Sequence, residues 1–167
     1  PGTSGTNVYW DFVELPSQMH ENWAYEKEWL DKFAVHYQTG EKMPEKLIEK
    51  IRQAQNFQAA YMMERQLSFG LLDMAYHHRE APVESELKPF EMAAIASTDL
   101  FEPVERSLQS ASFSHIFSGG YDAGYYSYKW AEVLDADAFA VFQEKGIFDR
   151  ETADSFRKNI LEKGGSE

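Results

Sequence analysis

Apolar side chains recur at intervals of three and four residues along most of the chain, which is the spacing of one face of an α-helix. Period-two alternation, which is typical of strands, is almost absent. The pattern therefore predicts an all-α protein. Its helices are expected at about residues 12–23, 26–37, 44–54, 57–78, 86–96, 121–143 and 149–163.

Capping residues mark several ends of these segments. Asp11 and Asp149 stand where a carboxylate can accept hydrogen bonds from the first backbone N–H groups of a helix. Pro44 stands at a typical first helical position, and Gly146 can end the helix that precedes it. The chain is long enough to bury one hydrophobic core, so we expect residues 1–167 to form a single helical domain.

The stretch from Ser114 to Trp130 has a composition that a plain core helix does not need. Its seventeen residues contain one histidine, three glycines, four tyrosines and one tryptophan. In a helix that begins near Tyr121, the phenols of Tyr121, Tyr125 and Tyr128 share one face. Such a row can be an aromatic core stripe or a set of hydroxyl donors, and composition alone leaves both interpretations open.

The net charge and the composition of the chain exclude several classes of partner and of metal ligand. The net charge is −12 and no basic cluster exists, so nucleic acid is not an expected partner. No stretch approaches the roughly 20 apolar residues of a membrane-spanning helix, so no membrane partner is expected either. The lack of cysteine excludes disulfides and thiolate metal ligands, and it suits a reducing compartment. We therefore expect a cytoplasmic protein, with the periplasm as the alternative.

The residue types contain no complete catalytic motif. The segment from His20 to Ala24 departs from the zinc-binding pattern His-Glu-x-x-His, because alanine stands where the second imidazole is needed. The chain has no Gly-x-Ser-x-Gly elbow and no phosphate-binding loop. Any metal would have to be held by His, Asp or Glu side chains.

Three long strings resemble the signatures of one family. They are Asp-Phe-Val-Glu-Leu-Pro-Ser-Gln-Met-His-Glu-Asn-Trp at 11–23, His-Ile-Phe-Ser-Gly-Gly-Tyr-Asp-Ala-Gly-Tyr-Tyr-Ser-Tyr-Lys-Trp at 115–130, and the ending at 148–167. In this order they resemble the thimet oligopeptidase family of zinc metallopeptidases. The resemblance implies a multi-helical, neurolysin-like fold with two lobes around a deep channel. The chain would be the C-terminal part of the catalytic lobe of a longer protein.

The resemblance also implies a zinc site of which this chain carries one ligand. The family's zinc is held by His-Glu-x-x-His and by a glutamate on a following helix, and the matching glutamate is Glu14. The His-Glu-x-x-His helix would precede Pro1. A carboxylate is a suitable ligand for a catalytic zinc. Without the resemblance, the default role of Glu14 is that of a solvated acid that stabilises the first turn of a helix.

The substrate-contacting residues implied by the resemblance lie in the stretch from Ser114 to Trp130, called the Gly/Tyr stretch below. His115, Tyr121 and Tyr128 match the family residues that contact substrate and stabilise the oxyanion, and Tyr121 and Tyr128 are the expected catalytic pair. Gly119 and Gly120 are expected to approach the substrate and to let the segment shift as it enters. Packing in a core is the alternative role of the three aromatic side chains.

These observations predict part of a zinc-dependent metallopeptidase that hydrolyses short peptides, either as an oligopeptidase or as a peptidyl-dipeptidase. The chain alone is expected to be inactive, because its zinc site is incomplete. It is also expected to self-associate through apolar faces that the rest of the protein would cover. The alternative is a stand-alone helical module that binds peptides without catalysis.

Overall fold

The structure is a computed structural model that describes residues 6–84, 86–102 and 104–166. These residues form helices joined by turns, with no β-strand among them, so the predicted all-α class is confirmed. One isolated antiparallel bridge joins Val35 and Lys42. No helix in the described ranges is long and apolar enough to cross a membrane. The α-helices are α1 (Trp10–Val13), α2 (Leu15–Glu21), α3 (Lys27–Leu30), α4 (Glu45–Gln55), α5 (Ala59–His77), α6 (Leu87–Ile95), α7 (Ser114–Phe117), α8 (Ser127–Lys145) and α9 (Arg150–Phe156).

Backbone contacts divide the described chain into two compact units. The first unit contains residues 6–57 and 130–166, and the second contains the described part of residues 58–129. Helix α8 starts at the end of the second unit and continues as part of the first. The single domain expected over residues 1–167 stays a prediction.

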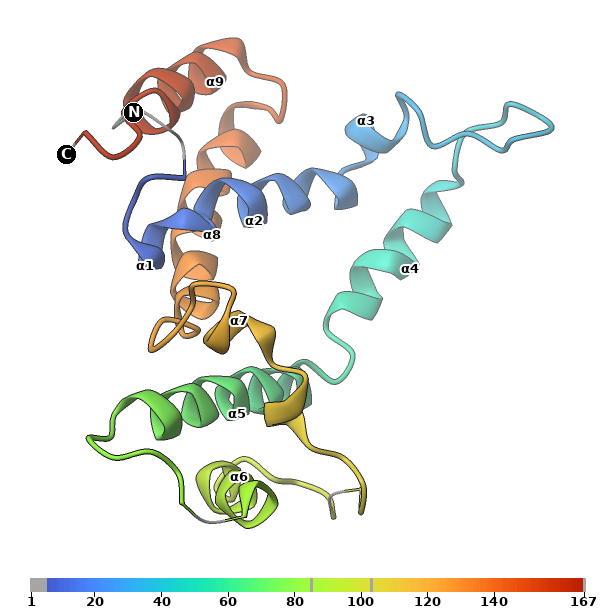
Figure 1. The fold of residues 1–167 in the computed structure, drawn as a ribbon. Coiled ribbons are helices and arrows are strands. Elements are labelled where there is room, and N and C mark those ends of the chain that lie inside the picture. Colours follow the sequence, from blue (N-terminus) through green and yellow to red (C-terminus); the bar gives the residue numbers. More distant parts are fainter. Residues whose placement is uncertain (1–5, 85, 103, 167) are drawn as a thin grey trace. The chain divides into compact units, whose positions relative to one another are not determined.

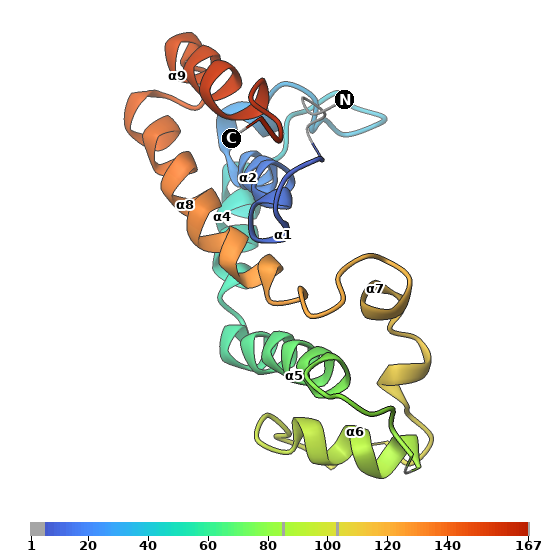
Figure 2. The same cartoon turned by 60° about the vertical axis from the view of Figure 1, so that its left-hand side comes forward.

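The core of the first unit forms where α2 packs beside α8 (Figure 2). Met19, Phe139, Phe142 and Ile147 are buried together there. Trp23 covers the edge of this cluster, with its ring centroid 4.8 Å from that of Phe139. The indole Nε1 of Trp23 donates a 3.0 Å hydrogen bond to the Ile147 carbonyl, so the ring packs without leaving its donor unpaired.

The second unit is organised by the long helix α5. Helices α5 and α6 lie side by side in both views of the fold (Figures 1 and 2). Leu72 of α5 is buried against Phe113 and Ile116, and the rings of Phe69 and Tyr125 pack onto this cluster. This small core ties α5 to the segment around α7, so α5 positions the Gly/Tyr stretch.

The last helix and the end of α8 follow the sequence prediction. Gly146 comes directly after α8 with a φ of 112°, a left-handed conformation that glycine adopts without strain. Asp149 is the N-cap of α9, and its carboxylate accepts a 2.8 Å hydrogen bond from the Thr152 amide. A π-helical turn, η3 (Arg157–Leu161), continues α9 and ends two residues before the predicted end at 163.

The first predicted helix, at residues 12–23, is divided in the structure. Helices α1 and α2 meet at Glu14, and the N-cap of α1 is Tyr9 rather than Asp11. Pro16 stands in the first turn of α2, where the missing amide hydrogen is tolerated. The single helix predicted here is therefore two helices, and Pro16 stands at the start of the second.

The segment predicted as a helix at residues 26–37 is mostly not helical. Only α3 forms, and the chain then turns back through Gly40, which has a φ of 73°. The Nδ1 atom of His36 accepts a 3.2 Å hydrogen bond from the Thr39 amide within this turn. The aromatic spacing that predicted a helix here belongs to a turn stabilised by a side chain.

Candidate functional site

The Gly/Tyr stretch begins with α7, a single helical turn that the sequence pattern did not predict. Gly119 and Gly120 follow it, and the Tyr121 amide donates a 2.9 Å hydrogen bond to the His115 carbonyl across them. A Cβ atom on residue 119 would lie 2.7 Å from the Cα of His115, and Gly120 has a φ of 83°. Both glycines are therefore required by the backbone itself. Their expected contact with substrate stays a prediction.

Residues 121–126, called the tyrosine loop below, form turns instead of the start of a helix. Helix α8 begins at Ser127, so the prediction of a helix from Tyr121 is wrong. The cause is Ala123, whose φ of 54° lies in the left-handed region and interrupts a right-handed helix. The Gly124 amide donates a 2.9 Å hydrogen bond to the Tyr121 carbonyl and closes the first of these turns.

The tyrosine loop nevertheless gathers the predicted rings into one place. The rings of Tyr121 and Tyr128 stack with their centroids 5.0 Å apart. The His115 ring centroid lies 6.0 Å from that of Tyr121 and 6.3 Å from that of Tyr128. The Tyr125 ring lies 5.1 Å from that of Tyr128. These four side chains are called the ring cluster below, and a turn brings them together where a helix face was expected.

A buried carboxylate on α5 holds the tyrosine loop. Asp73 is only 1% exposed. Its Oδ1 atom accepts a 2.8 Å hydrogen bond from the Ala123 amide, and its Oδ2 atom accepts one of 2.9 Å from the Tyr125 amide. The Nδ1 atom of His77, one helical turn further along α5, lies 2.8 Å from the same Oδ1. A buried charge is tolerated when N–H groups surround it in this way.

The Tyr125 side chain is partly buried in the second unit. Burial, together with the neighbouring Tyr128, raises the pKa of Tyr125 above its ordinary value, and the charge of Arg65 opposes this shift only in part. Its phenol therefore stays protonated at physiological pH and keeps its donor. Tyr126, by contrast, is exposed and takes no part in the ring cluster.

A second buried carboxylate holds the segment that leads into α7. Glu91 on α6 is 3% exposed and accepts hydrogen bonds from a short 3₁₀ helix, η2 (Gln109–Ala111). Its Oε1 atom accepts from the Gln109 amide at 3.0 Å, and its Oε2 atom accepts from the amide and hydroxyl of Ser110 at 2.8 and 2.7 Å. Burial works to raise the pKa of Glu91, but these hydrogen bonds outweigh it and lower the pKa.

Replacing Glu91 by glutamine should destabilise the chain by roughly 1–3 kcal/mol at neutral pH, because an amide oxygen satisfies only part of these donors. The carboxylate has a lowered pKa in the folded state. Its contribution to the free energy of unfolding is therefore present above its ordinary pKa of 4.5 and is lost as the pH falls through the lowered value. Thermal unfolding from about pH 7 to about pH 3 should show the Tm difference between wild type and Glu91→Gln shrinking with acid.

The matched control for this prediction is Glu105→Gln, which changes an exposed carboxylate of the same unit. It should leave the Tm close to that of the wild type at every pH. A Tm difference for Glu91→Gln that stayed constant into acid would contradict the assigned role of the carboxylate.

Glu14 lies at the junction of α1 and α2 and is half-buried. The Ser17 hydroxyl lies 2.7 Å from the Oε2 atom of Glu14 and 2.9 Å from its carbonyl oxygen, and this contact orients the side chain. An oriented carboxylate oxygen fits the chemistry of one zinc ligand. Within residues 6–84, 86–102 and 104–166, no three His, Asp or Glu side chains lie together as a metal site. Glu14 belongs to the first unit and the ring cluster to the second.

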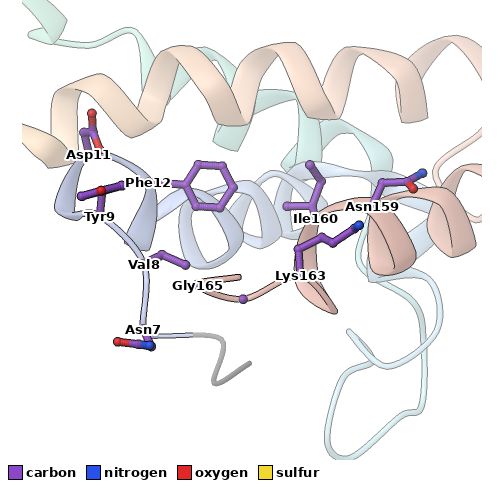
Figure 3. Close-up of a pocket in the computed structure, with 10 residues that line it drawn as sticks. Asn7, Val8, Tyr9, Asp11, Phe12, Asn159, Ile160, Lys163 and Gly165 are labelled. Carbon is purple, nitrogen blue, oxygen red and sulfur yellow. The ribbon is translucent and has the colours of Figure 1, made fainter. Parts of the chain in front are cut away.

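The cavity drawn in Figure 3 lies elsewhere in the first unit. Its volume is about 600 Å³, and residues of the 7–12 and 159–165 segments line it. Phe12 and Ile160 contribute apolar walls, and Lys163 contributes a cation. Glu14 does not line it, so this cavity is separate from the predicted zinc ligand.

Helix α5 carries large apolar side chains that remain exposed. Met63, Leu67, Leu71 and Met74 recur at intervals of three or four residues, so they share one face of the helix. Exposed apolar faces were expected from the sequence. The self-association that they would support stays a prediction.

Asp73 and Glu91 are the residues of this site that sequence reasoning missed. Each carboxylate interrupts an apolar run, since Asp73 stands between Leu72 and Met74. The sequence signal that could have revealed them is a charged residue at a core-facing position of a helix. Such a residue needs buried hydrogen-bond partners. His77 is one of the partners of Asp73.

Comparisons with known proteins agree with the strings noted in the sequence. The sequence profile of peptidase family M3 matches residues 1–167. Oligopeptidase A of Salmonella typhimurium is 49% identical over 176 residues, covering 99% of this chain and 25% of that protein. Dipeptidyl carboxypeptidase of the same organism is 43% identical over 165 residues, covering 98% of this chain and 24% of that protein. Saccharolysin of Saccharomyces cerevisiae is 36% identical over 168 residues, covering 95% of this chain and 22% of that protein.

The chain spans about a quarter of the length of these relatives. The family match nevertheless extends over both units and includes Glu14, Asp73 and the ring cluster. Because this match covers the whole sequence, the chain belongs to peptidase family M3.

Proposed function

We propose that this chain is the C-terminal part of the catalytic lobe of a zinc-dependent peptidase that hydrolyses short peptides. The observation that carries the proposal is the ring cluster, in which His115, Tyr121 and Tyr128 lie together in a member of a peptidase family. Two phenols beside an imidazole supply the hydrogen-bond donors that attack on a peptide carbonyl requires.

The proposed cofactor is zinc, and Glu14 would be one of its ligands. The Ser17 hydroxyl would orient the carboxylate for this role. Zinc, when bound, would polarise the peptide carbonyl and lower the pKa of a water molecule. The His-Glu-x-x-His ligands would come from a helix that precedes these residues.

Tyr121 and Tyr128 would donate hydrogen bonds to the oxyanion that forms when the peptide carbonyl is attacked. A phenol is neutral at physiological pH. It can therefore donate a hydrogen bond to the developing negative charge without being charged itself. His115 is exposed beside them and would contact the peptide. Gly119 and Gly120 would let this segment adjust as the peptide enters.

The substrates would be short peptides, and the protein would act as an oligopeptidase or as a peptidyl-dipeptidase. The names of the relatives include both activities, oligopeptidase A and dipeptidyl carboxypeptidase. We propose a cytoplasmic location, with the periplasm as the alternative. The chain alone would be inactive, because it supplies one zinc ligand.

The alternative function is a stand-alone helical module that binds peptides through the ring cluster without cleaving them. The reading frame upstream of Pro1 separates the two proposals. A His-Glu-x-x-His sequence about two dozen residues before Glu14 supports the peptidase, because it completes the ligand set. Its absence supports the module.

Metal analysis of the purified full-length protein tests the proposal directly. We expect one zinc per chain, loss of peptide hydrolysis after chelation, and recovery when zinc is restored. The isolated 167-residue chain should hold no stoichiometric zinc, because a single carboxylate is a poor site. Full hydrolysis by a metal-free protein, or peptide binding without any hydrolysis, would contradict the proposed function.

A further inference from the structure

We propose that Asp73 is the positioning residue of the ring cluster. Its carboxylate sets the backbone conformation of the tyrosine loop, and this conformation places the rings of Tyr121 and Tyr128 against each other. Asp73 acts through two backbone amides and not through the substrate. The catalytic consequence rests on the proposed function, whereas the structural consequence does not.

The position of Asp73 in α5 argues for a dedicated role. The residue directly follows Leu72, which is buried with Phe113 and Ile116, and it is as deeply buried as Leu72. An apolar side chain would fill such a position without desolvating a charge. The hydrogen bonds to the tyrosine loop are what offset the burial of this carboxylate.

The two amides that Asp73 binds stand on either side of Gly124. One carboxylate oxygen accepts from the Ala123 amide and the other accepts from the Tyr125 amide, at 2.8 and 2.9 Å. Both oxygens of a planar group are therefore used on alternate residues of one short loop. This arrangement fixes the orientation of two peptide units and leaves the loop little freedom to twist.

One of the two residues that Asp73 binds adopts a strained backbone conformation. Ala123 has a φ of 54°, and a non-glycine residue adopts this region only when its surroundings impose it. Without the acceptor on Asp73, residue 123 would return to the right-handed or extended region. Rotation there would separate Tyr121, on one side, from Tyr125 and Tyr128, on the other.

His77 orients the carboxylate. Its Nδ1 atom lies 2.8 Å from the Oδ1 of Asp73 and 2.9 Å from the Asp73 carbonyl oxygen. When Nδ1 carries the proton, the imidazole donates to the same oxygen that binds the Ala123 amide. A carboxylate fixed by a neighbour on its own helix presents its acceptors in one orientation.

Amide hydrogen exchange in the isotope-labelled 167-residue chain tests the structural part of the proposal. In wild type, the amides of Ala123 and Tyr125 should be protected, and the rings of Tyr121 and Tyr128 should show a nuclear Overhauser contact. In Asp73→Asn, both amides should exchange at least about tenfold faster and the ring contact should weaken, because one acceptor oxygen is lost. Glu105→Gln makes the same acid-to-amide change at an exposed position of the same unit, and it should leave both amides protected.

Steady-state kinetics of the full-length peptidase test the catalytic part. Asp73→Asn should lower kcat by about 10- to 100-fold while KM stays within about threefold, because misplaced phenols weaken the transition state more than the bound peptide. The control Glu105→Gln should keep kcat within about threefold of wild type. Glycine adopts a positive φ without strain, so Ala123→Gly added to Asp73→Asn should restore part of the lost kcat.

The outcomes separate this proposal from the proposed function. Unchanged exchange at Ala123 and Tyr125 in Asp73→Asn overturns the positioning role, whatever the kinetics show. An equal fall in kcat for Asp73→Asn and for the double variant with Ala123→Gly also overturns it, because that pattern reflects general destabilisation and not the conformation of residue 123. If the full-length wild type hydrolyses no peptide, the proposed function fails, and the exchange measurement still decides the role of Asp73.

Discussion

Replacing Glu14 by alanine in the full-length protein should lower kcat/KM on a short peptide by on the order of 10³-fold. The same change should reduce the bound zinc well below one per chain at limiting metal. The reason is that the variant removes a ligand of the proposed site, and the loss of a ligand exceeds the roughly 10- to 100-fold effect typical of groups that only orient one. Metal analysis after dialysis, together with initial rates, measures both effects.

Two further variants make the Glu14 experiment specific. Ser17→Ala removes the hydroxyl that lies 2.7 Å from the Oε2 of Glu14, so it should give an intermediate loss of about 10-fold. Glu28→Gln changes an exposed carboxylate on α3 and should retain full activity and full zinc content. A Glu14→Ala protein that keeps its zinc and its activity would remove Glu14 from the site.

Tyr121→Phe and Tyr128→Phe should each lower kcat by about 10²-fold or more in the full-length protein, with a much smaller change in KM. Phenylalanine keeps the ring, and therefore the stacking at 5.0 Å, while it removes the hydroxyl donor. The predicted loss thus reports the donor and not the packing. Initial rates over a range of peptide concentrations give kcat and KM separately.

Tyr126→Phe is the matched control for the two phenols. Tyr126 stands in the same loop, but its side chain is exposed, so the loss of its hydroxyl should change kcat by less than about threefold. Thermal unfolding of the three variants should show similar Tm values. A kcat that is unchanged in Tyr121→Phe or Tyr128→Phe would remove that residue from the proposed mechanism.

The sequence predicted the helical class. It also predicted the helices whose ends are marked by capping residues. Asp149 and Gly146 stand in the caps of α9 and α8, where local hydrogen bonds and a positive φ decide the boundary. Helix α5 was predicted because its apolar face extends over many turns. In these places, residues close in the sequence determine the structure, so periodicity and capping are sufficient.

The tyrosine loop shows where such reasoning fails. The spacing of Tyr121, Tyr125 and Tyr128 is helical, yet a carboxylate fifty residues earlier in the sequence holds Ala123 outside the helical region. No local pattern reveals a hydrogen bond between α5 and this loop. The rings nevertheless lie close together, because residues so near in the sequence can meet through a turn as well as through a helix.

The packing of Trp23 has a practical consequence for spectroscopy. All four tryptophans of the chain, at positions 10, 23, 29 and 130, belong to the first unit, whereas the tyrosines of the ring cluster belong to the second. Trp23 is held between Phe139 and Phe142 with its indole nitrogen bonded to a carbonyl. Selectively excited indole emission therefore reports the integrity of the first unit, although the predicted catalytic phenols lie in the second.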